Sequence, residues 1–260
     1  MPVSTIDITT SAGTCATEIV TPAGVGPWPA VILLHDAGGP RQAMTEMATR
    51  IAGPGYIVAI PDLFHRAGSV INLFPAGAVP SGDRQEIATK IFEDPALKEQ
   101  FFARYYGPAL AYENLHATLG PLLDHLVGRD DFRGGVGTTG YCMGGNASLR
   151  AATLFGARIA ATASIHGGFL AAPTPESPHL RANSIESRVY VAGASNDESF
   201  TDEMKQSLID ALASAHVPHT VETYPAEHGF AVPDASAYDA AAAERHYEAL
   251  DAFFGATLAR

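Results

Sequence analysis

The chain has 260 residues, of which 47% are hydrophobic and 17% are charged. This composition supplies a buried core and excludes an intrinsically disordered protein, and the length suits one large domain or two small ones. Sixteen lysines and arginines against 28 aspartates and glutamates give a formal net charge of −12. That charge argues against a nucleic-acid partner or an anionic membrane surface. The two cysteines are too few for a disulfide scaffold or a cysteine-rich zinc site.

Targeting signals are not visible in the chain. The first basic residue is Arg41, so no positive region precedes an apolar stretch as it does in a secretory signal. No run of apolar residues approaches the 18 that a membrane-spanning helix needs. We therefore expect a cytoplasmic protein that does not enter the membrane and keeps both cysteines reduced.

The first third of the chain predicts an edge hairpin followed by buried strands. Residues 3–10 and 15–21 alternate loosely around a Ser-Ala-Gly turn, which predicts the hairpin. The short apolar run 29–35 ends in a glycine turn and is typical of a buried parallel strand. A helical pattern follows over 41–52, and another buried strand is expected over 56–60.

The rest of the chain alternates between helices and strands. A stretch rich in glycine and proline, 63–83, has the length of a functional loop or a linker. Two helical segments are predicted after it, over 84–104 and 108–128. The remaining predicted elements are strands at 134–141, 159–165, 189–193 and 217–224, with helices at 143–156, 201–215 and 235–255.

This alternation predicts an α/β fold. Strands that alternate with helices form a mostly parallel, doubly wound sheet with helices on both faces. The glycines and prolines lie between elements, and no convincing linker separates two halves. We therefore expect one domain over residues 1–260.

Cys142 lies in the sharpest motif of the sequence, Gly140-Tyr141-Cys142-Met143-Gly144-Gly145. The motif fits the G-x-S-x-G nucleophile elbow with cysteine in place of serine, between a predicted strand and a predicted helix. Small neighbours let the backbone turn tightly, and a helix N-terminus favours the reactive thiolate. The alternative is a buried cysteine in a glycine-rich turn. Cys15, in the predicted hairpin, has no acidic or basic neighbour and is expected to be inert.

A base and an acid follow the cysteine along the chain. His228 comes after a predicted strand, although a lone loop histidine is usually solvated. Asp197 also follows a strand; it could instead belong to a helix start, and Glu198 is a nearby rival. The order of Cys142, Asp197 and His228 is that of α/β-hydrolases, and all three would meet at the carboxyl edge of the sheet. The combination favours nucleophilic catalysis.

Metal and cofactor motifs are not convincing. His216 and His219 are separated by Pro218, which spoils the helical geometry of a metal pair. The glycines at 134–137 lie out of register with a dinucleotide fingerprint. We expect neither a metal nor a cofactor.

These residues together resemble the dienelactone hydrolase family of α/β-hydrolases. The similar segments are residues 35–39, 61–66, 140–145, Asp197 and 228–230, and they span most of the chain. The resemblance implies an α/β-hydrolase fold without a separate cap domain and a catalytic triad of Cys142, His228 and Asp197. It also implies an oxyanion hole formed by the backbone N–H groups of Ala37 and Met143.

Two positions differ from the family pattern or match it only in part. Family members carry a glutamate at the position of Asp36, where it contacts the resting thiol; aspartate is one methylene shorter. Arg66 matches an arginine that binds the substrate carboxylate in the family, although it could also be a solvated loop residue. A second family arginine is replaced by Phe230-Ala231-Val232, which weakens the case for an anionic dienelactone.

The leading hypothesis is therefore hydrolysis of a small ester or lactone through an acyl-enzyme on Cys142. A carboxylesterase or thioesterase acting on another small acyl substrate is an alternative. A third possibility, from another class, is a ligand-binding or redox-sensing module that uses Cys142 without hydrolysis. The expected partner is a small molecule, and the sequence leaves the oligomeric state open.

Overall fold

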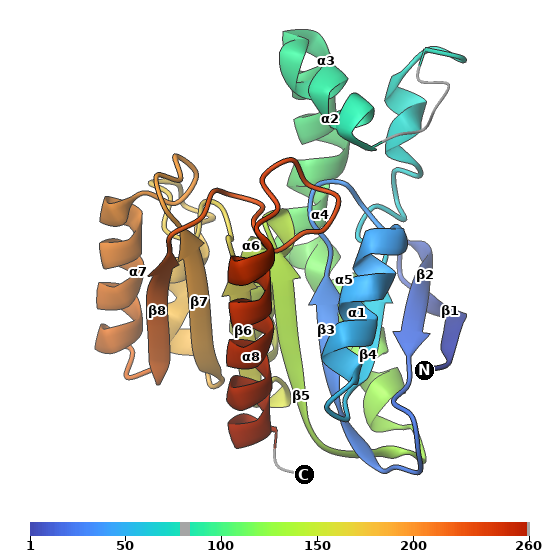
Figure 1. Ribbon diagram of the computed structural model, residues 1–260, viewed down its shortest axis with the longest axis vertical. Helices are drawn as coiled ribbons and strands as arrows, with labels where there is room; N and C mark the ends of the chain where they lie inside the picture. The colour runs from blue at the N-terminus through green and yellow to red at the C-terminus, as the bar shows by residue number, and fades with distance from the viewer. Residues whose placement is uncertain (79–83, 259–260) are drawn as a thin grey trace.

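A mixed eight-stranded sheet forms the centre of the computed structural model, which describes residues 1–78 and 84–258 (Figure 1). Within these residues the strand order is β1-β2-β4-β3-β5-β6-β7-β8. The first two strands form an antiparallel hairpin at one edge, β2 pairs antiparallel with β4, and every later pairing is parallel. The strands are β1 Val3–Thr10, β2 Gly13–Val20, β3 Trp28–Leu34, β4 Ile57–Pro61, β5 Phe132–Tyr141, β6 Ala161–Ile165, β7 Arg188–Ala194 and β8 His219–Tyr224.

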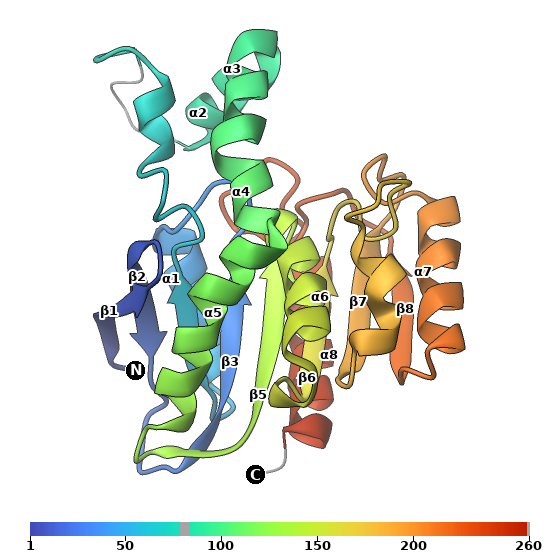
Figure 2. The ribbon, with the colours of Figure 1, turned by 180° about the vertical axis from the view of Figure 1, so that it is seen from behind.

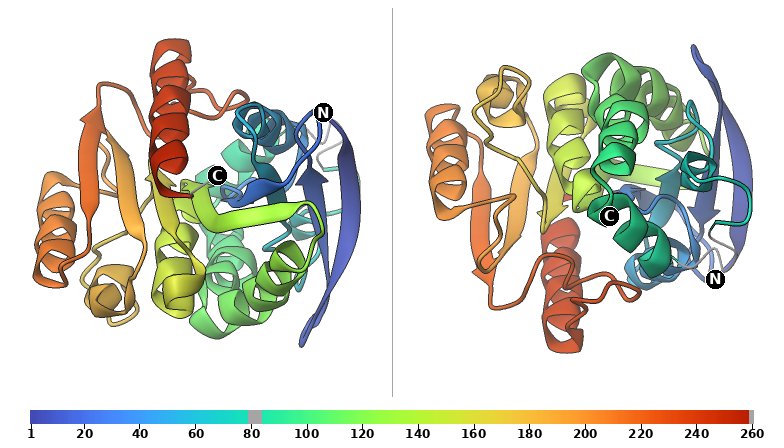
Figure 3. Two further views of the ribbon diagram at one scale, coloured as in Figure 1. Left: turned by 90° about the horizontal axis from the view of Figure 1, so that it is seen from below. Right: turned by 90° about the horizontal axis from the view of Figure 1, so that it is seen from above.

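Helices cover both faces of this sheet, as the sequence predicted. Two helices lie on one face, α1 Gln42–Ala52 and α8 Ala240–Thr257 (Figure 3). The other face is covered by α5 Tyr112–Val127, α6 Met143–Phe155 and α7 Asp202–Ser214 (Figure 2). The predicted α/β-hydrolase architecture is therefore confirmed.

The core is divided by the alternation of side chains along the strands. On β3, Ala30, Ile32 and Leu34 enter the apolar cluster beneath α5 and α6, whereas Val31 and Leu33 enter the cluster beneath α1 and α8. Successive residues of a strand point to opposite faces, so one apolar run supplies both layers.

The segment that the sequence predicted as one helix over 84–104 is broken. It forms α2 Arg84–Glu93, α3 Pro95–Phe101 and a π-helical turn, Phe102–Tyr106. Asp94 causes the break, because its carboxylate accepts hydrogen bonds from the N–H groups of Ala96 and Leu97 and Pro95 occupies the first helical position.

The predicted helix over 108–128 is also divided. It consists of α4 Gly107–Leu110 and α5, because Ala111 between them has an extended ψ of 130°. The predicted loop 63–83 contains a short 3₁₀ turn, Val70–Leu73, and its residues 79–83 lie outside the described residues.

Residues 63–78 and 84–111 form an excursion that rises beyond the carboxyl edge of the parallel strands (Figures 1 and 2). The short helices η3 Gly156–Arg158 and η4 Pro178–Ser184 complete the fold. In the part of the chain that is described, no helix combines the length and apolar character required to span a bilayer.

Candidate active site

Cys142 occupies a tight turn between β5 and α6. Its backbone has φ +54° and ψ −115°, a region that costs a non-glycine residue on the order of 1–3 kcal/mol. A Cβ atom at Gly140 would lie 1.9 Å from the carbonyl oxygen of Gly144, and one at Gly144 would lie 2.0 Å from that of Leu34. These glycines are required because the helix start packs directly on neighbouring backbone. The thiol is half-buried at the carboxyl edge of the sheet.

Asp197 and His228 form a hydrogen-bonded pair beyond the ends of β7 and β8. The Nδ1–H group of His228 donates to Oδ2 of Asp197 at 2.7 Å. Asp197 is buried, whereas the rival carboxylate, Glu198, is exposed. Burial opposes ionisation of Asp197, but the hydrogen bonds from His228 and Ser199 outweigh it and lower the pKa of the carboxyl.

His228 is also electrostatically linked to Cys142. Burial lowers the pKa of the His228 imidazole. The hydrogen bonds that His228 donates to Asp197 and Cys142, together with the negative charge of these two groups, outweigh burial and raise the pKa of His228 to about 10. The structure therefore brings Cys142, Asp197 and His228 to one edge of the sheet.

Ser199 donates two hydrogen bonds to the carboxylate of Asp197, and sequence reasoning missed this residue. Its Oγ donates to Oδ1 of Asp197 at 2.6 Å, and its backbone N–H donates to the same oxygen at 2.9 Å. The sequence did contain a local signal for this contact. The carboxylate of an aspartate in a turn commonly accepts the backbone N–H of the residue two positions further along the chain, which here is Ser199.

His166 is a second residue that sequence reasoning missed. It follows β6, the strand between those that carry Cys142 and Asp197, and it is fully buried. Its Nδ1 accepts the backbone N–H of Cys142 at 3.2 Å, and its ring lies 5.1 Å from that of His228. Burial and the neighbouring His228 lower the pKa of His166 to about 3, so it is neutral. Its position directly after a strand of the same edge was the available signal.

The backbone amides of Ala37 and Met143 are the donors that the sequence analysis expected for an oxyanion hole. Met143 is the first residue of α6, and Ala37 follows β3, the strand that pairs with β5 through Leu34 and Gly140. Within residues 1–78 and 84–258, neither N–H group donates a hydrogen bond to the protein. Met143 opens a helix, and the first amides of a helix lack intrahelical acceptors, whereas Ala37 lies in the turn between β3 and α1. Both N–H groups are therefore available to a ligand.

The carboxylate of Asp36 is held by Arg41, which the sequence analysis did not single out. Both Nη atoms of Arg41 donate to Asp36, at 2.8 and 2.9 Å, and Nε and Nη2 donate to Asp234 at 2.7 and 2.9 Å. Asp36 also accepts the N–H of Gly38 at 2.8 Å. The proposed action of Asp36 on the thiol stays a prediction, and its carboxylate serves at least to fix the turn after β3.

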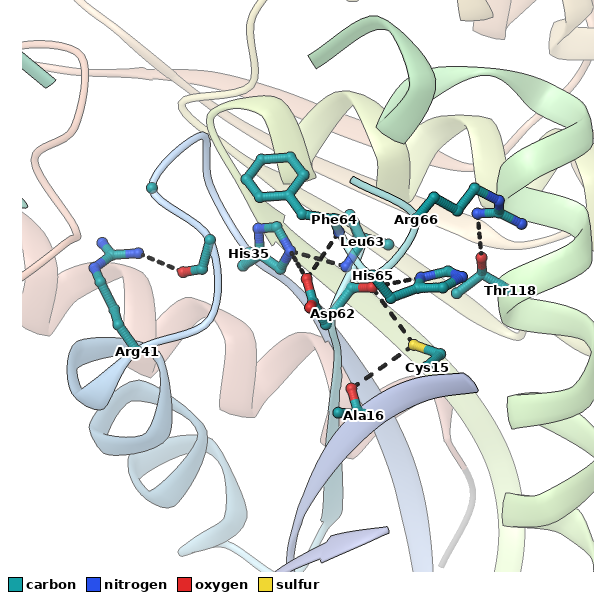
Figure 4. Close-up of polar contacts among 12 residues, drawn as sticks. Cys15, Ala16, His35, Arg41, Asp62, Leu63, Phe64, His65, Arg66 and Thr118 are labelled. Atoms are coloured by element: carbon teal, nitrogen blue, oxygen red, sulfur yellow. Dashed lines mark hydrogen bonds and ion pairs between the residues drawn. The ribbon is translucent and has the colours of Figure 1, made fainter. Parts of the chain in front are cut away.

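Arg66 points toward α5 (Figure 4). Its Nη1 donates to Oγ1 of Thr118 at 3.1 Å, and burial lowers the pKa of its guanidinium. Its contact with a substrate carboxylate stays a prediction. Figure 4 also places Cys15 beside Asp62, whose carbonyl oxygen accepts from the thiol at 3.5 Å. Burial raises the pKa of Cys15 to about 11, which keeps this thiol protonated.

Two hollows border the site. A cavity of about 590 Å³ lies between the turn after β3 and the excursion, and Ala37 and Arg41 are part of its wall. An open cleft of about 560 Å³ is lined by residues 195–198 and 225–228, and so contains the Asp197–His228 pair. No group of three or more histidine, cysteine, aspartate or glutamate residues suited to a metal ion occurs in the described part of the chain.

Comparison with known proteins gives a consistent result. A model of the "Dienelactone hydrolase family" matches residues 15–258. A protein of Synechocystis, provisionally named carboxymethylenebutenolidase, is 26% identical over 96% of this chain and 98% of its own. Carboxymethylenebutenolidase of Rhodococcus opacus is 29% identical over 77% of this chain and 69% of its own. A crystal structure from Klebsiella pneumoniae, provisionally named dienelactone hydrolase, superposes with a TM-score of 0.78 at 19% identity, covering 98% of both chains.

Proposed function

Because the chain belongs to the dienelactone hydrolase family and is a carboxylic ester hydrolase, we propose that it cleaves a small ester or lactone with Cys142 as nucleophile, His228 as base and Asp197 as the residue that orients the base. The observation that carries this proposal is the 2.7 Å hydrogen bond between His228 and Asp197 beside the strained elbow of Cys142. The chemistry requires this arrangement of nucleophile, base and orienting acid.

Acylation begins with attack of the Cys142 thiolate on the substrate carbonyl carbon. A carbon–sulfur bond forms, and the carbonyl electron pair moves to the oxygen. The N–H groups of Ala37 and Met143, which donate to no described protein group, support a role as donors to that oxyanion. The oxyanion then collapses, the carbon–oxygen bond of the leaving group breaks, and imidazolium His228 supplies the proton that an alkoxide needs.

Deacylation follows the same path with water as nucleophile. Neutral His228 takes a proton from water while the oxygen of that water attacks the thioester carbon. The carbon–sulfur bond breaks, which releases the carboxylic acid product and restores the Cys142 thiolate and imidazolium His228. Asp197 holds Nδ1 of His228 throughout, so that Nε2 faces the reacting atoms.

The test uses the Cys142→Ala variant and a panel of p-nitrophenyl acetate, dienelactone and an acyl thioester. We expect Cys142→Ala to lose at least about 10³-fold in kcat on every substrate that the unchanged protein hydrolyses. His228→Ala should fall to a similar level. Activity retained by purified Cys142→Ala protein would refute the nucleophile.

The same panel separates the alternative functions. Ester and thioester cleavage use the same groups, so their relative kcat/KM values decide which substrate class is preferred. A ligand-binding or redox-sensing protein would hydrolyse none of the panel. Its Cys142 would also be alkylated by iodoacetamide with the pH dependence of an ordinary thiol.

A further inference from the structure

The cavity of about 590 Å³ has a predominantly apolar wall. Its wall combines residues of the turn after β3 with residues of the excursion, beyond the carboxyl edge of the sheet. Its volume is in the range of cavities that bind small molecules, roughly 300–1,000 Å³. The apolar side chains in its wall include Phe64, Val70, Ile91, Phe92 and Phe101.

This cavity is adjacent to the elbow. Ala37, one of the two candidate oxyanion donors, forms part of its wall. Ala37 and Cys142 are both partly exposed, and both pack against the apolar cluster that contains Phe64, Ile91 and Phe101. A carbonyl group bound at the amide of Ala37 would therefore have the cavity as its neighbour.

The order of the strands defines which part of a substrate faces the cavity. Cys142 follows β5; the acid–base pair lies on one side of it, beyond β7 and β8, and the cavity lies on the other side, beside β3 and β4. His228 must be next to the leaving group in order to protonate it. The acyl group then points away from His228, toward the cavity.

The charges of the wall favour an uncharged occupant. Arg41 lines the cavity, but its guanidinium is already bound by the carboxylates of Asp36 and Asp234 and by the carbonyl oxygen of Gly39. Arg66 is directed to Thr118 instead. A substrate carboxylate would have to compete with two carboxylates for Arg41, whereas an apolar chain gains from burial against the phenylalanines.

We infer that the excursion forms an acyl-binding subsite, and that the substrate is an ester with an uncharged, extended apolar acyl chain. This inference rests on the proposed hydrolysis through Cys142. The open cleft beside Asp197 and His228 accommodates the leaving group.

The experiment compares p-nitrophenyl acetate with p-nitrophenyl octanoate. For the unchanged protein, kcat/KM should be at least about tenfold higher for octanoate, because its longer acyl chain buries more apolar surface in the cavity. Ala88→Phe places a large side chain in the cavity wall. It should lower kcat/KM for octanoate about tenfold and change that for acetate less than about twofold.

A matched control is Ala96→Phe, which adds the same side chain at an exposed position of α3. It should leave both substrates unchanged. Val70→Phe fills the same cavity from a different segment. It replaces Ala88→Phe in the test if Ala88→Phe does not fold.

Binding separates failure of the subsite from failure of the hydrolytic function. Cys142→Ala protein should bind octanamide in a calorimetric titration, and adding Ala88→Phe should weaken that binding about tenfold. If no ester is hydrolysed but this pattern holds, the proposed function is wrong and the acyl site stands. Equal kcat/KM for acetate and octanoate, with no octanamide binding, would overturn the acyl site.

Discussion

Nδ1 of His166 accepts the backbone N–H of Cys142 at 3.2 Å, which ties the strained turn of Cys142 to the end of β6. The same N–H also points to the carbonyl oxygen of Ile165 at 3.2 Å. Nε2 of His166 is buried and has no hydrogen-bond partner within the described residues. His166 thus contributes one hydrogen bond to the elbow and leaves one polar atom unsatisfied.

Substitution of His166 by phenylalanine should separate positioning from stability. Phenylalanine removes the acceptor but also removes the buried unpaired nitrogen, so the free energy of unfolding should change by less than about 1 kcal/mol. The turn that carries Cys142 loses one of its two acceptors, and kcat should fall about tenfold with KM unchanged. Urea unfolding and steady-state kinetics measure the two effects. If the variant loses both kcat and several kcal/mol of the free energy of unfolding, His166 has a purely structural role.

The pKa of His228 predicts how its contribution to stability depends on pH. In the folded protein it is raised from 6.5 to about 10. A group with a raised folded-state pKa stabilises the protein fully below its unfolded pKa, so this contribution is complete below pH 6.5 and lost as the pH rises to about 10. Unfolding of the unchanged protein and of His228→Gln, measured from pH 6 to 10.5, should give a difference that shrinks toward high pH. A difference independent of pH would contradict the prediction, and a lower NMR titration midpoint for His228 in Asp197→Asn would support it.

Removal of Arg41 should destabilise the turn that carries Ala37. The side chains of Arg41 and Asp36 are only 14% and 4% exposed, so Arg41→Ala leaves a buried carboxylate without its cation. We expect a loss of about 3 kcal/mol in the free energy of unfolding, measured in urea. Arg158→Ala is the control, because Arg158 and Asp124 form an exposed pair whose loss should cost less than about 1 kcal/mol. Similar losses in both variants would mean that burial of the Arg41 pair is unimportant.

Local patterns in the sequence were enough to predict the sheet and its helices. The alternation of β1 and β2, the apolar runs of β3 and β4 and the strand–glycine–helix pattern at Cys142 each reflect interactions among near neighbours. The breaks at Asp94 and Ala111 were not predicted. Asp94-Pro95 carried a recognisable helix-start signal, whereas the extended backbone of Ala111 had no comparable cue.

The site was predictable only where chain order determines which groups meet. Cys142, Asp197 and His228 follow three parallel strands, so topology alone brings them to one edge. The bond from Arg41 to Asp234 joins residues 193 positions apart, and nothing near either residue predicts it. The direction of Arg66 toward α5 likewise depends on how the excursion packs.

The position of β8 at the open edge of the sheet affects how the protein would lose activity on heating. Among the described strands β8 pairs with β7 alone, and His228 lies in the loop that follows it. Edge elements can detach by local unfolding at a lower free-energy cost than the core. A transient release of β8 would withdraw His228, the proposed base, while Cys142, Ala37 and Met143 stayed beside the ends of the central strands β3 and β5. Thermal inactivation would then precede global melting, because each such opening would leave Cys142 in place without His228.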